Sequence, residues 1–323
     1  MARVAVLDDW QRVARACTDW ASLEARAELR FFTEPFASED EAAAALAGFD
    51  VILAMRERTL FPKSLIDRLP ALRMFGLTGM RAGKIDLAYL QQRGVVVCYT
   101  GGGPGVESTA ELALALMLAA ARRIPEAERS VRAGRFQLDT PTGFVLAGKT
   151  LGLVGLGKIG SRMARYGKAL GMTVHAWSQN LTDARAAEAG AQLVTKEELL
   201  ARADVVSLHL VLSPRTRDIL GAAEIARMKR GAILVNTSRA PLVNEAALIA
   251  AARDGRIVAA LDVYEREPLP ADHPLLTCPN TVLTPHLGYS VLEVYREFYA
   301  QGAENALAFL AGAPMRLLPK QSA

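Results

Sequence analysis

Three short apolar runs in the last third of the sequence are each followed by polar residues that could do chemistry. The runs are predicted to be buried strands and cover Ile233–Asn236, Val258–Leu261 and Thr281–Thr284. Arg239 follows the first run, the acids Asp262, Glu265 and Glu267 follow the second, and His286 follows the third. Because the carboxyl ends of parallel strands meet at one edge of a sheet, we expect these side chains to share a crevice. A guanidinium can hold a carboxylate and its neighbouring carbonyl, and an imidazole beside a carboxylate can give and take a proton.

A glycine-rich turn earlier in the chain predicts the cofactor of such a crevice. Residues 151–160, LGLVGLGKIG, have the G-x-G-x-x-G spacing between an expected strand and an expected helix. Gly155 would allow the tight turn, Gly157 the approach of the backbone to a pyrophosphate, and Gly160 close packing of helix on strand. Lys158 and Ile159 begin the helix, whose free N–H groups and positive dipole end would face that anion. We therefore predict a dinucleotide site.

The residues after the next expected strand leave the choice between NAD and NADP open. In this motif an acid about 20 residues further on holds the ribose hydroxyls of NAD. Here the strand Thr173–Trp177 is followed by Ser178, Gln179 and Asn180, and no Asp or Glu occurs from residue 161 to 182. We expect these three residues to line the ribose and the cofactor to be NAD or NADP, with Arg185 as the nearest downstream candidate for a ribose phosphate.

Short apolar runs alternate with helical patterns along almost the whole chain, which is typical of an α/β protein with parallel sheets. Further strands are expected at Val4–Leu7, Val51–Ala54, Leu72–Phe75, Val95–Cys98, Leu151–Val154 and Val205–Leu210. Helices are expected at Glu39–Ala47, Glu107–Arg122, Lys158–Leu170, Lys196–Ala201, Ala222–Met228, Glu245–Arg253 and Val291–Leu310. We predict a Rossmann-type doubly wound parallel sheet that binds NAD(P) in residues 104–288. It is inserted into a smaller flavodoxin-like α/β substrate domain made of residues 1–103 and 289–323.

The composition argues against several other classes of protein. The 323 residues carry a net charge of +4, but basic and acidic residues are interspersed, so we expect no nucleic-acid partner. The longest apolar run, Leu112–Ala121, is far shorter than the roughly 20 residues of a membrane-spanning helix, so we expect no membrane partner. The three cysteines are scattered, which indicates a reducing, cytoplasmic location, and no Cys or His cluster has the spacing of a metal site.

The chain resembles the D-isomer-specific 2-hydroxyacid dehydrogenase family over essentially its whole length. The resemblance rests on four motifs in the family's order: the glycine fingerprint at 155–160, NTSRA at 236–240, DVYEREP at 262–268 and TPHLG at 284–288. It implies NAD(P)-dependent hydride transfer between a 2-oxo acid and a D-2-hydroxy acid. It further implies that Arg239 binds the substrate, that His286 donates and accepts the proton, and that Glu267 tunes this histidine. Glu265 is the rival acid, but Glu267 directly precedes the proline, as the family's acid does.

Further residues are expected beside the cofactor. The resemblance places Asp262 near the nicotinamide, and the alternative is a strand-end residue with local hydrogen bonds. His209, at the end of the expected strand Val205–Leu210, and Thr237, in the NTSRA motif, would line the same edge of the sheet.

A loop of the substrate domain departs from the family's usual sequence. The family's Val-Gly-x-Asp-Asn is replaced by MRAGK at residues 80–84, although the amides of Met80 and Arg81 are still expected to bind the substrate carboxylate. We hypothesise that some of the arginines Arg56, Arg58 and Arg81 bind a second anionic group of a larger substrate. The alternative is that they are solvated or pair with Glu57.

Tyr289 and the long apolar helix each allow two interpretations. Many relatives carry a small residue at the position of Tyr289, which could line the substrate pocket or pack between the domains. The helix Val106–Arg122 could form the interface of a homodimer, which the resemblance implies. Its apolar run could instead be buried between the two domains of one chain.

Two other functions remain compatible with the motifs. Phosphite oxidation uses similar Arg, Glu and His positions, whereas formate oxidation is disfavoured because Thr284-Pro285 precedes His286 and Glu267 is available. A dinucleotide-sensing, co-repressor-like binding protein could also keep the fold and the three side chains. The sequence favours the dehydrogenase because no basic patch or docking segment accompanies the fold.

Overall fold

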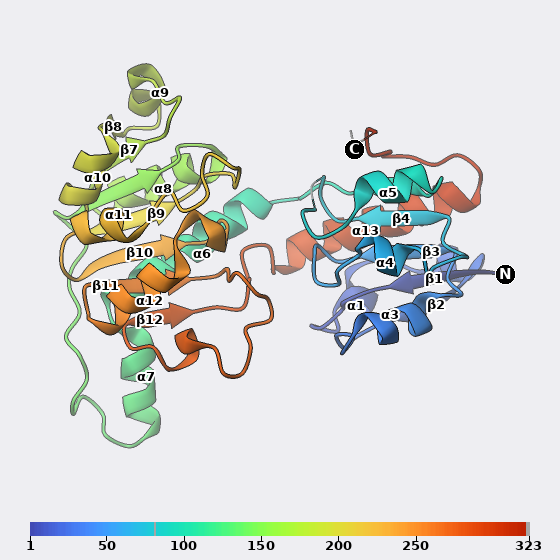
Figure 1. Cartoon of the computed structure of the whole chain (residues 1–323), viewed down its shortest axis with the longest axis horizontal. Helices are drawn as coiled ribbons and strands as arrows, with labels where there is room; N and C mark the ends of the chain where they lie inside the picture. Colours follow the sequence, from blue (N-terminus) through green and yellow to red (C-terminus); the bar gives the residue numbers. More distant parts are fainter. Residues whose placement is uncertain (81, 321–323) are drawn as a thin grey trace. The chain divides into compact units, whose positions relative to one another are not determined.

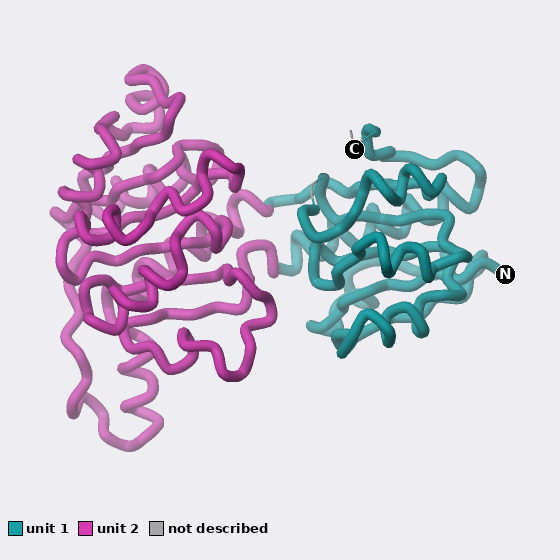
Figure 2. Tube along the Cα trace, in the orientation of Figure 1, with its two compact units in different colours: residues 1–104, 291–323 teal, residues 105–290 magenta. Residues whose placement is uncertain are grey.

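The computed structural model describes residues 1–80 and 82–320 and divides into two compact units (Figure 1, Figure 2). Unit 1 contains Met1–Pro104 and Val291–Ala323, and unit 2 contains Gly105–Ser290. The chain therefore passes between the units twice, and unit 2 is an insertion within unit 1.

Unit 1 is built on a five-stranded parallel sheet with the strand order β2-β1-β3-β4-β5. Its strands are β1 (Ala2–Val6), β2 (Ala27–Phe31), β3 (Val51–Ala54), β4 (Met74–Leu77) and β5 (Val96–Tyr99). Its helices are α1 (Ala14–Cys17), α2 (Ala21–Glu24), α3 (Glu39–Leu46), α4 (Lys63–Ile66), α5 (Leu87–Gln92) and α13 (Leu292–Leu310). This strand order is that of flavodoxin-like folds, which confirms the predicted fold class.

Unit 2 is built on a seven-stranded parallel sheet with the order β12-β11-β10-β9-β6-β7-β8. Its strands are β6 (Thr150–Val154), β7 (Thr173–Trp177), β8 (Gln192–Leu193), β9 (Val205–Leu208), β10 (Ala232–Asn236), β11 (Ile257–Leu261) and β12 (Thr281–Leu283). Its helices are α6 (Gly105–Ala121), α7 (Ile124–Arg132), α8 (Lys158–Ala169), α9 (Asp183–Glu188), α10 (Lys196–Arg202), α11 (Ala222–Arg227) and α12 (Glu245–Arg253), with 3₁₀ turns η1 (Ala240–Leu242) and η2 (Pro274–Thr277). Across the sheet, the six adjacent strands β8-β7-β6-β9-β10-β11 have the Rossmann order, and β12 extends the sheet by one strand.

Every predicted strand is present with small shifts at its ends, and two strands were not predicted. β2 alternates between buried and more exposed positions, so its sequence AELRF lacks the continuous apolar run of a central strand. β8 has only two residues, Gln192 and Leu193, and lies at the edge of its sheet. Edge strands of this kind leave little hydrophobic signal in the sequence.

The long apolar helix is buried against the sheet of its own unit. α6 packs against β10, β11, β12 and α8, and its residues Ala113, Met117 and Ala121 are fully buried. It ends because Arg123 adopts a left-handed conformation with φ of 54°. α7 then begins at Ile124; it was not predicted, and it extends away from the sheet in Figure 1.

The described residues give direct answers about membrane spans, thiols and metal ligands. No helix among them is both long and apolar enough to cross a bilayer. Cys17, Cys98 and Cys278 are buried free thiols. No three His, Cys, Asp or Glu side chains in residues 1–80 and 82–320 are grouped as a metal ion would require.

Candidate active site

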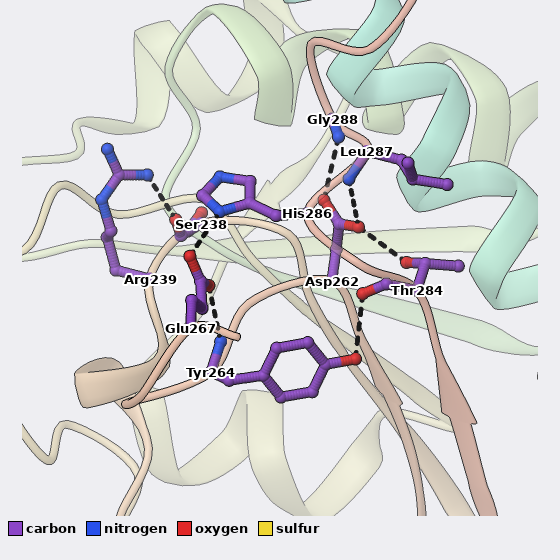
Figure 3. Close-up of polar contacts among 9 residues, drawn as sticks. All are labelled: Ser238, Arg239, Asp262, Tyr264, Glu267, Thr284, His286, Leu287 and Gly288. Atoms are coloured by element: carbon purple, nitrogen blue, oxygen red, sulfur yellow. Dashed lines mark hydrogen bonds and ion pairs between the residues drawn. The ribbon is translucent and has the colours of Figure 1, made fainter. Parts of the chain in front are cut away.

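His286 and Glu267 form a hydrogen-bonded pair at the carboxyl edge of the unit 2 sheet (Figure 3). Nδ1 of His286 lies 2.8 Å from Oε2 of Glu267. The backbone N–H of Tyr264 donates to the other carboxylate oxygen of Glu267 over 2.9 Å. With Glu267 ionised, its carboxylate can only accept, so the bonded proton belongs to Nδ1 and Nε2 of His286 can serve another partner. The predicted histidine and acid are therefore brought together.

Asp262 holds the loop that carries His286. Its Oδ1 accepts hydrogen bonds from the Thr284 hydroxyl and the Leu287 N–H, both over 2.7 Å, and its Oδ2 accepts from the Gly288 N–H over 2.9 Å. Asp262 is fully buried, and this burial raises its pKa although the hydrogen bonds act in the opposite direction. The loop needs such support because His286 has a φ of 56°, in the left-handed region that non-glycine residues rarely adopt.

The structure thus gives Asp262 a supporting role at the end of its strand, but its hydrogen-bond partners lie 22, 25 and 26 positions away and are not local as the alternative interpretation expected. Its predicted place near the nicotinamide remains a prediction. Tyr264 is a second supporting residue, because its hydroxyl donates to the carbonyl of Thr284 over 2.9 Å. Sequence reasoning missed the roles of Tyr264 and Thr284, although both lie within the recognised motifs DVYEREP and TPHLG.

Arg239 follows β10 on a loop that is fixed by side-chain hydrogen bonds. The Asn236 amide donates to the Arg239 carbonyl over 2.9 Å and accepts from the Ser238 N–H over 3.0 Å. The guanidinium of Arg239 donates to the Ser238 carbonyl over 2.7 Å. Figure 3 shows this side chain close to His286 and Glu267, so three strand ends bring an arginine, an acid and a histidine to one edge.

The glycines of the fingerprint leave the space that a pyrophosphate requires. Gly155 has a φ of 101°, and a Cβ there would lie 2.8 Å from the carbonyl of His209. A Cβ at Gly160 would lie 2.2 Å from the Gly155 oxygen, so neither glycine can carry a side chain. Gly157 is different, because nothing lies within 4 Å of a Cβ placed on it, and it directly precedes Lys158 and Ile159 at the start of α8. These residues fit a bound dinucleotide.

Two buried polar atoms near the fingerprint have no partner among the described residues, namely Nδ1 of His209 and Oγ1 of Thr237. His209 directly follows β9, which ends at Leu208 and not at the predicted Leu210, and Thr237 directly follows the neighbouring strand β10. Burial lowers the pKa of His209 to about 4, so its ring is neutral near pH 7. Since buried polar groups are normally hydrogen-bonded, these atoms fit a polar ligand at this edge.

The predicted ribose-binding residues begin beside the fingerprint turn. The N–H of Gly155 donates to the carbonyl of Trp177 over 2.8 Å, which sets Ser178 next to the turn. Ser178 is half-buried, whereas Gln179 and Asn180 are exposed. Their predicted contact with the ribose stays a prediction.

The residues predicted to bind the substrate from the first part of the chain all belong to unit 1. Met80 is 55% exposed, and Arg81 lies outside the described residues. Arg58 donates to the Asp8 carbonyl over 2.6 Å and to the Tyr295 hydroxyl over 3.0 Å. Arg56 donates to the Thr78 carbonyl over 3.0 Å. Both arginines therefore make internal hydrogen bonds, and binding of a second anion by these arginines remains a hypothesis.

A family model matches more than half of the chain. The model is described as "D-isomer specific 2-hydroxyacid dehydrogenase, NAD binding domain" and matches residues 114–288. This segment contains the fingerprint, the NTSRA and DVYEREP motifs and His286. The match and the geometry therefore concern the same unit.

Individual relatives agree with that match. A D-3-phosphoglycerate dehydrogenase of Archaeoglobus fulgidus is 39% identical over 265 residues, which are 82% of this chain and 50% of the relative. This chain therefore spans about half the length of the first curated relatives that it matches. A glyoxylate reductase of Aeropyrum pernix is 41% identical over 258 residues, 77% of this chain and 76% of the relative. A crystal structure of a phosphoglycerate oxidoreductase from Vibrio cholerae o395 superposes with a TM-score of 0.91 at 36% identity, covering 97% of this chain and 100% of that one.

Proposed function

The chain belongs to the D-isomer-specific 2-hydroxyacid dehydrogenase family, and from this premise we propose that it interconverts 2-oxo acids and D-2-hydroxy acids with NAD(H) or NADP(H). The observation that carries the proposal is the 2.8 Å pair of His286 and Glu267 on the sheet edge that also bears the glycine fingerprint. A proton carrier beside a dinucleotide site is what reduction of a carbonyl needs.

The cofactor would supply or accept the hydride. Backbone groups at Gly155, Gly157, Lys158, Ile159 and Gly160 would bind its pyrophosphate. Ser178, Gln179 and Asn180 would contact its ribose, and the unpartnered atoms of His209 and Thr237 would meet its polar groups.

His286 is proposed to move the proton. In the reduction, its protonated ring donates the Nε2 proton to the substrate oxygen as negative charge develops there, and the ring becomes neutral. In the oxidation, neutral Nε2 takes the hydroxyl proton back. Glu267 holds Nδ1 throughout, and its negative charge stabilises the protonated ring.

Arg239 is proposed to bind the substrate carboxylate and the neighbouring carbonyl oxygen. Its planar guanidinium can form parallel hydrogen bonds to both groups. The hydrogen bonds of Asn236 to the Arg239 carbonyl and the Ser238 N–H hold the loop before the substrate arrives, so less freedom is lost on binding. Arg239 therefore orients the carbonyl for attack.

The substrate is proposed to be a 2-oxo acid, and the experiment is a rate assay of reduced-cofactor loss with NADH and NADPH in parallel. The panel contains glyoxylate, hydroxypyruvate and 3-phosphohydroxypyruvate, because relatives are named for glyoxylate and 3-phosphoglycerate, and also branched, aromatic and dicarboxylic 2-oxo acids. Turnover of at least one member supports the proposal. Binding of NAD(P)H without turnover of any member would contradict it and would favour a binding protein.

We also propose that two copies of the chain associate in a reducing cytoplasm. Support comes from large exposed apolar side chains on α7 and the following segment, namely Ile124, Val131, Phe136, Leu138 and Val145, and from the free buried cysteines. Light scattering should give twice 34.7 kDa. Charges introduced by Val131→Asp and Phe136→Asp should yield the monomer mass, while Leu60→Asp, at an exposed position of unit 1, should not.

A further inference from the structure

Tyr289 contacts the ring of the proposed proton carrier, and the mechanism above gives it no role. The ring centroids of Tyr289 and His286 are 5.8 Å apart, and the ring planes meet at 71°, which is an edge-to-face arrangement. Both residues belong to unit 2. Such aromatic pairs are attractive beyond the area that they bury.

The backbone next to Tyr289 is fixed from two sides. The carbonyl of Gly288 accepts hydrogen bonds from the hydroxyls of Ser108 over 2.8 Å and Thr109 over 2.9 Å, both on α6. The N–H of Gly288 is held by Asp262. Residue 289 is therefore presented to His286 by α6 and the Asp262 anchor, and the ring contact does not depend on a freely moving loop.

Glu267 alone does not determine the orientation of the imidazole. A single hydrogen bond at Nδ1 tolerates a range of distances and angles, so the torsions χ1 and χ2 of His286 keep some freedom. A second contact, from an aromatic ring at a large interplanar angle, restricts this freedom. The direction of Nε2, which proton transfer requires, then depends on both neighbours.

We propose that Tyr289 is a positioning residue that, together with Glu267, orients the imidazole of His286 for proton transfer. The inference rests on the proposed function for its consequence, but the ring orientation itself can be measured without a substrate. The aromatic ring carries the effect, so phenylalanine at this position should replace tyrosine.

The first experiment is nitrogen NMR of the unliganded protein labelled with ¹⁵N-histidine. The chain has four histidines, and the signals of His286 are assigned by their loss in His286→Gln. Wild type and Tyr289→Phe should show His286 with its proton on Nδ1. Tyr289→Ala should keep the proton on Nδ1, because Glu267 still accepts it, but should show His286 signals that are shifted or broadened by exchange among ring orientations. An unchanged His286 spectrum in Tyr289→Ala would overturn the inference, as would equal changes in the Phe and Ala variants.

The second experiment separates positioning from substrate binding. With any substrate that the wild type turns over, Tyr289→Ala should lower kcat by about 2- to 12-fold, the range expected for an aromatic pair, with KM nearly unchanged. Tyr289→Phe should keep most of the wild-type kcat. A raised KM with unchanged kcat would make Tyr289 a wall of the substrate site and contradict positioning. A wild type that turns over no 2-oxo acid would contradict the proposed function, and the NMR result would still decide the orientation of His286.

Discussion

The two units have related sheets, yet their corresponding crevices differ completely. In each sheet the winding direction reverses once, between β1 and β3 in unit 1 and between β6 and β9 in unit 2. Ligands of such sheets bind outside the carboxyl ends of the strands at this point. In unit 2 the point is formed by Gly155 and His209, with open space beyond Gly157.

In unit 1 the same point is occupied by the chain's own side chains. Asp8 follows β1, and its carboxylate accepts hydrogen bonds from the N–H and hydroxyl of Thr59 over 3.2 and 2.9 Å. Arg58 donates to the Asp8 carbonyl and lies over the ring of Trp10, with 4.7 Å between its Cζ and the ring centroid. The topology therefore supplies a crevice in both units, and glycines or side chains decide whether the crevice can hold a dinucleotide.

Apart from loss of His286 itself, the largest predicted effect concerns the acid of unit 2. Glu267→Gln keeps the shape of the side chain but removes the charge that stabilises protonated His286, so kcat should fall by about 10³-fold. Glu265→Gln, two residues earlier and exposed, is the matched control and should keep the wild-type rate. The measurement is the steady-state rate of 2-oxo acid reduction. Equal losses in both variants would remove the distinction between the two acids.

Asp8 in unit 1 and His209 in unit 2 should change the free energy of unfolding with pH in opposite directions. Burial raises the pKa of Asp8 from 3.8 to about 6, so folding favours the protonated form. The proton on Asp8 contributes about 3 kcal/mol to the free energy of unfolding. This contribution is complete below about pH 4 and is lost as the pH rises through about 6. Burial lowers the pKa of His209 from 6.5 to about 4. Its contribution, of about the same size, is full above pH 6.5 and is lost as the pH falls through about 4.

Urea unfolding at pH 4 and pH 7 tests this pair of signs. Trp10 and Trp20 report on unit 1, and Trp177 reports on unit 2. The free energy of unfolding of wild type relative to Asp8→Asn should decrease from pH 4 to pH 7. The free energy of wild type relative to His209→Gln should increase over the same range. Changes of the same sign would contradict the assigned ionisation states.

A smaller effect is expected when the open space of unit 2 is filled. Gly157→Ala meets no atom within 4 Å and should fold normally, but its methyl group should keep the backbone from a pyrophosphate. The Kd for NADH and NADPH, measured by energy transfer from tryptophan, should rise about 10- to 100-fold, the worth of a hydrogen bond to a charged group. Gly102→Ala in unit 1 serves as a comparison at another open glycine without a left-handed φ, and an unchanged Kd in Gly157→Ala would contradict the cofactor site.

The smallest predicted effect concerns the choice of cofactor. Because Ser178 stands where an acid would repel the ribose phosphate of NADP, the wild type should bind NADPH at least as well as NADH. Ser178→Asp should weaken NADPH binding by about tenfold and affect NADH little. Asn180→Asp, at an exposed position two residues further on, is the control. If Ser178→Asp binds both NADH and NADPH with the wild-type affinity, this residue does not face the ribose.

Short-range patterns made much of this account predictable from the sequence. The fingerprint and the apolar runs are local, so the meeting of an arginine, an acid and a histidine at one sheet edge follows from strand ends. The choice of Glu267 over Glu265 came from the family resemblance. The anchoring of the His286 loop by Asp262 joins residues 25 and 26 positions apart, and the bond of Arg58 to Tyr295 spans 237 positions. No local pattern contains these contacts, nor the left-handed backbone of His286 that Asp262 supports. α7 was missed for a related reason, because the left-handed conformation of Arg123 that separates it from α6 has no signal in the sequence.

The most direct test of the account is the rate of 2-oxo acid reduction by His286→Gln. His273→Gln is the matched control, since His273 also lies in unit 2 and also faces an acid, with Nε2 3.5 Å from the carboxylate of Glu245. His286→Gln should bind NAD(P)H with the wild-type Kd and lose about 10²- to 10⁴-fold in kcat, while His273→Gln should keep the wild-type kcat. A His286→Gln variant that reduces 2-oxo acids at the wild-type rate would contradict the assignment of this sheet edge as the active site.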